Sequence, residues 1–124
     1  MTTRTDQTAI ATGSGPGLRP ITSATFDEVL ATAAVPVVVD FGAAWCPPCG
    51  PMKAVLAEVA AAHPGALDAW QVDVDVEVDL ARRFDVMSLP TLLVFVDGEL
   101  VLRTVGARGR GRLLEDLAPH LDLR

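Results

Sequence analysis

The chain has few of the features that mark secreted or membrane proteins. Two cysteines in 124 residues are too few for a disulfide scaffold. The first twenty residues contain no apolar segment of the kind found in a secretory signal. The longest apolar runs, at 35–39 and 92–96, fall far below the roughly 20 residues that a membrane-spanning helix needs. These absences favour a soluble protein of the reducing cytoplasm, with no membrane partner.

Positive charge is also scarce. The sequence has 10 Lys and Arg against 16 Asp and Glu, a formal net charge of −6. Such a chain repels nucleic-acid phosphates and anionic membrane surfaces. Residues 108–112 read RGRGR, similar to a short RNA-binding tract, but in an acidic chain a docking patch or a solvated loop is the better interpretation. We therefore expect no nucleic-acid partner.

Length and apolar content predict one globular domain. A chain of 124 residues, half of them apolar, can bury a single core. Residues 1–17 are rich in Thr, Gly, Ser and Pro, a composition that predicts a flexible tail. The folded domain is therefore expected to span residues 18–124.

Apolar periodicity predicts alternating strands and helices in this domain. The expected strands are 18–22, 35–41, 69–74, 91–96 and 100–105, and the expected helices follow an N-cap at Thr22 or Ser23, follow Cys49, cover 77–84 and run along 113–121. Asp97-Gly98 is typical of a two-residue hairpin turn. The order βαβαβαββα indicates an α/β fold with a partly parallel sheet covered on both faces, and the hairpin adds antiparallel strands at one edge.

Residues 45–49, WCPPC, carry the clearest chemical signal. Two cysteines at this spacing form either a redox dithiol or half of a zinc site. Zinc usually takes four ligands, but the chain has no other cysteine, and His63 and His120 each stand alone. Redox chemistry is favoured and no metal is expected; a zinc site shared across a dimer is the remaining alternative.

A redox dithiol needs a nucleophile, a resolving thiol and a route for protons. Cys46 is expected at a helix N-terminus, where the helix dipole and free N–H groups favour the thiolate. It would attack a substrate disulfide, and Cys49 would then attack the Cys46 sulfur. Asp40, near the end of the apolar run VVVDF, is the candidate base because burial raises the pKa of a carboxyl group. On the local sequence alone, a purely structural role for Asp40 is equally compatible.

The prolines of this segment predict an irregular start to the helix. Those at 47–48 fit a first turn, where an N–H group has no helical partner. Pro51 removes a further N–H, and a proline disfavours helical geometry in the residue before it. The regular ladder is therefore expected to start near Met52, leaving the N–H groups of Cys49 and Gly50 for the nucleophilic sulfur.

From about Phe26 to its C-terminus, the chain resembles the thioredoxin family. The segments VVVDF, WCPPC, SLPTLLVF, DGEL and TVGA carry the likeness, in the family's order and spacing. The resemblance implies the thioredoxin fold, with a central five-stranded mixed sheet flanked by four helices. It also implies a protein-disulfide reductase that is itself re-reduced by an NADPH-dependent flavoprotein, thioredoxin reductase. We expect a monomer with no cofactor beyond a redox-active Cys46–Cys49 disulfide.

The resemblance also assigns individual roles. Matched by motif, Cys46 is the nucleophile, Cys49 the resolving thiol and Asp40 the buried carboxylate, while Pro90 matches a cis-proline that faces the dithiol. The cis bond would let the backbone of Leu89 pair with an extended substrate segment.

A shallow apolar groove is expected beside the dithiol, completed by Trp45 and by the Gly106-Ala107 loop. Plain core packing is the alternative for Trp45.

Several positions depart from the family's usual pattern. The family usually has Gly-Pro between the cysteines, a Trp after the buried Asp, a cation and then a Pro after the second Cys, and a Lys on the third strand. The corresponding residues here are Pro47-Pro48, Gly42, Gly50, Ala54 and Gln71. The missing strand lysine predicts a further rise in the pKa of Asp40. The missing indole predicts a more open groove, and the missing cation predicts a less stabilised thiolate.

Three classes of function remain compatible with the sequence. The first is a dithiol reductase, and the second is a thiol oxidase or isomerase of the same fold with a more oxidising dithiol. The third is a non-catalytic binding module that uses only the groove. The intact dithiol, with an Asp and a matching proline, argues against the third.

Overall fold

The computed structural model describes residues 18–122. The tail expected at 1–17 and the last two residues of the chain lie outside this range. Within it, none of the helices combines the length and the apolar character that a bilayer crossing requires.

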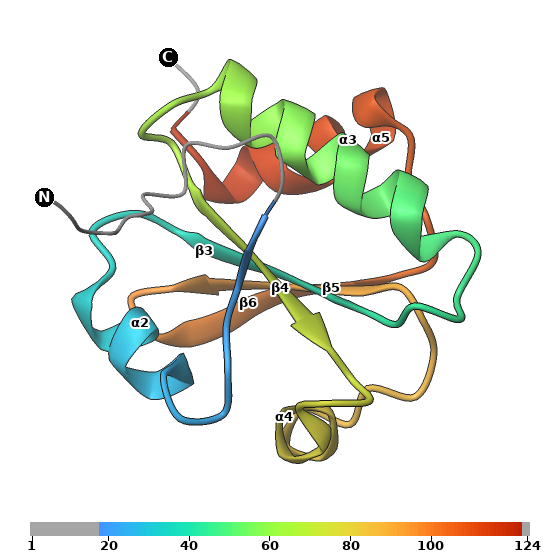
Figure 1. Cartoon of the computed structure of the whole chain (residues 1–124). Helices are drawn as coiled ribbons and strands as arrows, with labels where there is room; N and C mark the ends of the chain where they lie inside the picture. Colours follow the sequence, from blue (N-terminus) through green and yellow to red (C-terminus); the bar gives the residue numbers. More distant parts are fainter. Residues whose placement is uncertain (1–17, 123–124) are drawn as a thin grey trace, which may run out of the picture.

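A five-stranded mixed sheet forms the centre of the molecule (Figure 1), with the strand order β2-β4-β3-β5-β6. Strands β2, β4 and β3 pair with one another in parallel, and β5 and β6 are added by the antiparallel pairings β3–β5 and β5–β6. The strands are β2 (Arg19–Pro20), β3 (Val37–Gly42), β4 (Asp68–Asp73), β5 (Thr91–Val96) and β6 (Glu99–Val105). The predicted α/β class, mixed sheet and element order are confirmed.

Helices cover both faces of the sheet. Residues 18–122 form four α-helices, α2 (Phe26–Thr32), α3 (Cys49–Ala62), α4 (Val78–Arg83) and α5 (Arg110–Leu117), and a short 3-10 helix, η1 (Ala118–His120), follows α5. In Figure 1, α3 and α5 lie on one side of the sheet and α2 and α4 on the other. The five strands and four α-helices agree with the thioredoxin fold that the resemblance implies.

Strand β3 separates two apolar clusters by alternation of its side chains. Val37, Val39 and Phe41 pack in the cluster that includes residues of α2 and α4. Val38 packs in the opposite cluster with residues of α3 and α5. Since successive side chains of a strand point to opposite faces, Asp40 lies on the same face as Val38, beneath α3.

The predicted Asp97-Gly98 turn is confirmed. Both residues have positive φ, 52° and 81°, which is the conformation of a type I′ hairpin turn. Here Gly98 adopts a geometry that side chains resist. The turn holds β5 and β6 in an antiparallel pair, with one irregularity between Val94 and Phe95.

The boundaries of several elements differ from those predicted. Strand β4 occupies 68–73 rather than 69–74, and α4 occupies 78–83 rather than 77–84. The last helix was expected to continue to Leu121, but α5 ends at Leu117 and the chain tightens into η1 at Pro119. Proline cannot donate a helical hydrogen bond, which is consistent with this change of geometry.

The assigned helix α2 begins at Phe26, and the residue before it is Thr25, which makes no side-chain cap hydrogen bond. The capping hydrogen bonds nevertheless come from Thr22, one of the two residues predicted. Its Oγ1 accepts the N–H of Thr25 at 3.2 Å, and its carbonyl accepts the N–H of Phe26 at 2.9 Å. The other candidate, Ser23, donates from its backbone N–H and its hydroxyl to Glu77 Oε1, at 2.9 and 3.1 Å. Ser23 therefore bonds to a partner 54 positions away in the chain and does not cap the helix.

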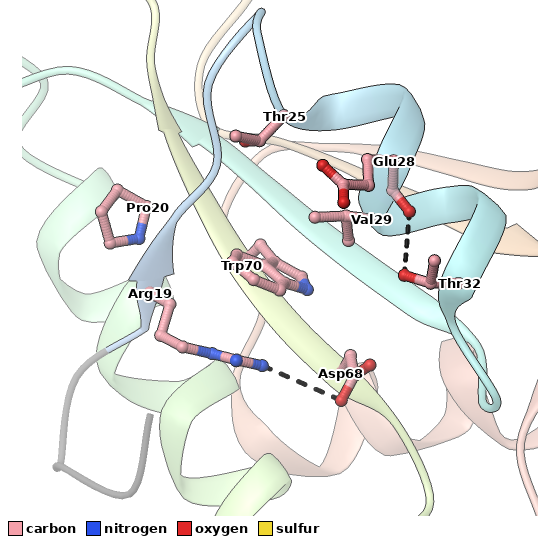
Figure 2. Close-up of a pocket in the computed structure, with 8 residues that line it drawn as sticks. All are labelled: Arg19, Pro20, Thr25, Glu28, Val29, Thr32, Asp68 and Trp70. Atoms are coloured by element: carbon pink, nitrogen blue, oxygen red, sulfur yellow. Dashed lines mark hydrogen bonds and ion pairs between the residues drawn. The ribbon is translucent and has the colours of Figure 1, made fainter. Parts of the chain in front are cut away.

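Edge strand β2 is attached to β4 by side chains as well as by backbone pairing. The guanidinium of Arg19 lies 4.0 Å from the ring centre of Trp70 and 3.9 Å from Asp68 Oδ1. Figure 2 shows these residues lining a cavity of about 550 Å³, together with Val29 and other residues of α2. This cavity contains neither cysteine, and we assign it no part in the redox chemistry.

We predict that Leu56→Ala lowers the free energy of unfolding by about 2–5 kcal/mol, because Leu56 is fully buried between α3 and the sheet. The matched control is Leu100→Ala on β6, since 42% of Leu100 is exposed; it is expected to cost less than about 1 kcal/mol. Urea denaturation of the oxidised protein measures both. Equal losses in the two variants would contradict the assigned core.

Candidate redox site

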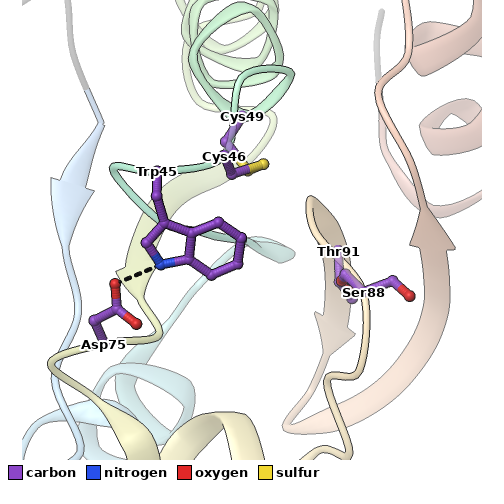
Figure 3. Close-up of a disulfide and its surroundings, with 6 residues drawn as sticks. All are labelled: Trp45, Cys46, Cys49, Asp75, Ser88 and Thr91. Atoms are coloured by element: carbon purple, nitrogen blue, oxygen red, sulfur yellow. Dashed lines mark hydrogen bonds between the residues drawn. A yellow bond between two sulfur atoms is a disulfide. The ribbon is translucent and has the colours of Figure 1, made fainter.

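The two cysteines lie where the chain passes from β3 into α3. They are joined by a disulfide, with their Cα atoms 5.4 Å apart. Only 7% of Cys46 and 3% of Cys49 is exposed, so Cys46 is the more accessible of the two. Figure 3 shows the disulfide between the indole of Trp45 and the start of α3. The roles expected for the two cysteines, nucleophile for Cys46 and resolving thiol for Cys49, remain predictions.

The first turn of α3 is short of N–H donors. The first helical residue is Cys49, and the N–H of Met52 donates to Pro48 O at 3.2 Å, so the prediction of a ladder starting near Met52 is confirmed. The N–H of Cys49 was expected to serve the sulfur of Cys46 but donates to the Cys46 carbonyl at 3.2 Å. Of the two donors predicted, Gly50 alone has an N–H with no backbone acceptor among the described residues.

Asp40 lies in the middle of the apolar sheet with 1% of its surface exposed, and its Oδ1 atom has no hydrogen-bond partner. Burial raises the pKa of this carboxyl to about 7, and the charge of Lys53 opposes the rise. The expected direction of the shift is confirmed. The strand lysine of the family is replaced by Gln71, but Lys53 on α3 supplies a cation that the sequence analysis did not consider.

A cavity of about 420 Å³ connects the carboxyl group to the dithiol. The residues that line it come from β3, β4, α3 and the loop between β3 and α3, and include Asp40, Cys46, Cys49, Lys53 and Gln71. A space of this size and polarity can hold water between Asp40 and Cys49.

Gly42 brings β3 against Cys49. A Cβ atom on Gly42 would lie 3.2 Å from Cys49 Cβ and 3.3 Å from Cys49 Sγ, closer than ordinary van der Waals contact. The sequence analysis expected the missing indole at this position to open the groove beside Trp45. Gly42 instead lines the cavity beneath the dithiol, and the lining of that cavity does not include Trp45 or Leu89.

Three segments distant in the sequence meet beside the dithiol. The Leu89–Pro90 peptide bond is cis, as expected from the resemblance. The carbonyl of Pro90 accepts a hydrogen bond from Gly106 N–H at 2.8 Å, and the N–H of Arg108 donates to Met52 Sδ at 3.3 Å. These bonds join the Gly106-Ala107 loop to the start of β5 on one side and to α3 on the other.

Trp45 is a surface residue, so the alternative of plain core packing is wrong. Its exposed fraction is 65%, and its indole Nε1 donates to Asp75 Oδ2 at 2.8 Å (Figure 3). The hydrogen bond gives Asp75 a specific role, because it fixes the orientation of an exposed indole next to Cys46.

Two further residues were missed. Met87, three positions before Pro90 in the chain, is 90% exposed, which is unusual for a large apolar side chain. The sequence signal that could have identified Met87 was a large apolar residue in a loop that has neither strand nor helix periodicity. Lys53 follows Cys49 by four residues, a spacing that places both on one side of a helix.

Among residues 18–122, no group of three or more His, Cys, Asp or Glu side chains is close enough together to bind a metal ion. The cysteines are paired with each other rather than with metal-ligating histidines.

Comparison with known proteins places this site in a family. The family model described as thioredoxin matches residues 17–119. A thioredoxin of Mycobacterium tuberculosis is 42% identical over 98 residues, which cover 79% of this chain and 84% of that protein. A thioredoxin of Staphylococcus haemolyticus is 42% identical over 101 residues, 82% of this chain and 95% of that protein.

A longer relative is similar to this chain over part of its own length. A bifunctional thioredoxin reductase/thioredoxin of Mycobacterium leprae is 41% identical over 98 residues, which cover 79% of this chain and 21% of that protein. The chain belongs to the thioredoxin family of dithiol–disulfide oxidoreductases.

Proposed function

We propose that this chain is a protein-disulfide reductase in which Cys46 attacks, Cys49 resolves and Asp40 accepts the proton of Cys49. The observation that carries the proposal is the cavity shared by the dithiol and a buried, unpaired carboxyl. A carboxyl with a pKa of about 7 is matched to proton transfer near neutral pH. The redox-active group is the Cys46–Cys49 pair itself.

The first step begins from the reduced protein. The Cys46 thiolate attacks one sulfur of a substrate disulfide, forming a mixed disulfide, and the other substrate sulfur leaves as a thiolate that takes a proton from water. Cys46 is the better placed thiol because it is the more exposed and lies beside Trp45.

The second step releases the substrate. Cys49 passes its proton to the Asp40 carboxylate, and its sulfur attacks the sulfur of Cys46. The bond between Cys46 and the substrate breaks, and the second substrate sulfur leaves as a thiolate and is protonated. The substrate gains two electrons and two protons, and the protein is left with the Cys46–Cys49 disulfide.

We assign substrate binding to the face that surrounds Cys46. Following the resemblance, we assign to this face the exposed Trp45, the backbone of Leu89 beside Pro90, and the Gly106-Ala107 loop, which is bonded to the carbonyl of Pro90. An extended substrate segment can pair with the Leu89 backbone as an added strand. The protein substrates are therefore expected to present their disulfide in an extended segment.

A thioredoxin reductase is the proposed electron donor. The relative from Mycobacterium leprae is named as a bifunctional thioredoxin reductase/thioredoxin. We infer that a separate NADPH-dependent reductase re-reduces the Cys46–Cys49 disulfide here. Repeated turnover of this kind suits a reducing compartment, so the cytoplasm remains the expected location and a monomer the expected state.

The short supply of donors around Cys46 favours a reductase over an oxidase. A strongly oxidising dithiol requires a well-stabilised thiolate in its reduced form. The prolines at 47, 48 and 51 have no N–H group, and the N–H group of Cys49 already donates to the carbonyl of Cys46. The Cys46 thiolate therefore receives little stabilisation from the backbone.

We predict that Cys46→Ser abolishes the reduction of insulin by this protein, because it removes the nucleophile. Cys49→Ser is expected to retain the attack but to accumulate a mixed disulfide through Cys46, since nothing resolves it. Turbidity of reduced insulin and mass spectrometry of the protein measure the two outcomes. Release of the trapped substrate by dithiothreitol is the control. Insulin reduction by both variants at the rate of the wild type would contradict the roles assigned to the two cysteines.

A second prediction concerns Asp40→Asn. A raised pKa means that the native protein holds this proton more tightly than the unfolded chain, so stability falls as pH rises from about 4 to about 7. The variant lacks this loss, and its advantage over the wild type should grow to about 4 kcal/mol by pH 8.

Urea denaturation of the oxidised proteins at pH 4, 6 and 8 measures this difference. Glu99→Gln, which removes an exposed carboxyl from β6, is the matched control and should keep the wild-type pH dependence. A stability difference between Asp40→Asn and wild type that stays constant with pH would contradict the assignment.

A further inference from the structure

Lys53 is the only lysine of the chain; the other nine of its ten basic residues are arginines. An ammonium ion is a compact point charge on a flexible stem, whereas a guanidinium is a planar fork suited to paired hydrogen bonds. This single lysine lies on the wall of the 420 Å³ cavity between Asp40 and the dithiol.

Helix α3 places Lys53 one turn beyond Cys49. Residues four apart in a helix lie on the same face, so the stem of Lys53 follows Cys49 along the side of α3 that borders the cavity. Lys53 is itself exposed. Its charged end can therefore remain hydrated while its field reaches the buried carboxyl.

The other walls of the cavity offer Asp40 no cation. From β4, Gln71 is neutral and its amide donates to the backbone at Leu18, while Asp73 has the same sign as Asp40. From β5, the register partner of Asp40 is Leu92. The two cysteines complete the titratable groups of the lining. Among the described residues that line the cavity, Lys53 is the only cation.

The charge of Lys53 acts against burial. Burial alone would raise the pKa of Asp40 further and leave less carboxylate at neutral pH, and Lys53 opposes this rise. Asp40 Oδ1 has no hydrogen-bond partner, so the carboxylate remains free to accept a proton. A directly hydrogen-bonded cation would occupy the carboxylate and make it a weaker base.

We propose that Lys53 is a positioning residue for the reaction, whose ammonium charge keeps Asp40 ionised and available to the proton of Cys49. The inference rests on the proposed function of Asp40 as the base. When the disulfide closes, the proton moves from Cys49 to Asp40, the new bond joins Cys49 to Cys46, and the substrate sulfur leaves with the electron pair of the bond that breaks. Lys53 gains and loses no atom.

The resolution step can be followed with 2,2′-dithiodipyridine, a small uncharged disulfide. Reduced protein releases one thiopyridone when Cys46 attacks and a second when Cys49 closes the disulfide, so stopped-flow absorbance separates the two phases. The rate of the second phase is measured against pH for wild type, Lys53→Gln, Lys53→Arg, Asp40→Asn and the Asp40→Asn/Lys53→Gln double variant. Arg82→Gln on α4 is the control for net charge, because Arg82 does not line the cavity.

The expected result is an upward shift of the midpoint of this pH profile by about half a unit or more in Lys53→Gln, which slows resolution about threefold below the midpoint. Lys53→Arg and Arg82→Gln should keep the wild-type midpoint. The shift should vanish in the Asp40→Asn background, because the charge acts through Asp40.

Three results distinguish the possible failures. If Lys53→Gln matches wild type while Asp40→Asn does not, the role of Lys53 is overturned and the function of Asp40 stands. If Asp40→Asn also matches wild type, the proposed base is overturned. A shift that persists in the double variant overturns the proposal, because Lys53 would then act on the thiols directly.

Acetylation gives a second measurement that needs no substitution. Lys53 and the N-terminus are the only amines of the chain. Acetylated wild type should show the midpoint of Lys53→Gln, whereas acetylated Lys53→Arg, in which only the N-terminus reacts, should keep the wild-type midpoint. Identical midpoints for the two acetylated proteins would overturn the proposal.

Discussion

The burial of the Asp40 carboxyl group in the central strand sets the conditions for the rest of the site. Strand β3 has β4 on one side and β5 on the other, so neither edge of it reaches water. A carboxylate in this position loses its hydration, and no hydrogen bond to Oδ1 replaces it. The group is therefore held near the point where it gains or loses a proton at neutral pH. Burial of this carboxyl lowers the stability of the protein at neutral pH, but under the proposed function it provides a group that can accept the proton of Cys49.

The other parts of the site bring the dithiol and a cation close to this carboxyl group. Gly42, two residues further along the same face of β3, lets the strand approach Cys49 closely. The cavity keeps a path open between the carboxyl and the thiol, and Lys53 provides a cation across it. Trp45, which does not line this cavity, stands exposed next to Cys46 in the chain. We propose that the cavity side of the dithiol handles the proton and that the side with Trp45 binds the substrate.

Much of this arrangement could be predicted from the sequence because it depends on local patterns. The run VVVDF indicated a buried strand with an acid in it, and the Asp97-Gly98 turn indicated the final hairpin. Those signals lie within a few residues of each other. What could not be predicted depends on partners far apart in the chain: Ser23 bonds to Glu77, and Trp45 bonds to Asp75.

Lys53 illustrates the limit most clearly. The sequence analysis compared one strand position with the family, found Gln71 in place of a lysine, and predicted a further rise in the pKa of Asp40. Helical spacing from Cys49 was visible in the sequence, but only the packing of α3 over β3 brings that helix face to Asp40. The cation is thus present, supplied by a different element of the fold.

Infrared spectroscopy tests the central claim most directly, because a protonated carboxyl group has a carbonyl band that a carboxylate lacks. The difference between spectra of the oxidised wild type and Asp40→Asn isolates this one group. The account predicts a protonated-carboxyl band at pH 5.5 that disappears with a midpoint near pH 7. Absence of the band at pH 5.5 would contradict it, because Asp40 would then be ionised as an ordinary exposed aspartate is.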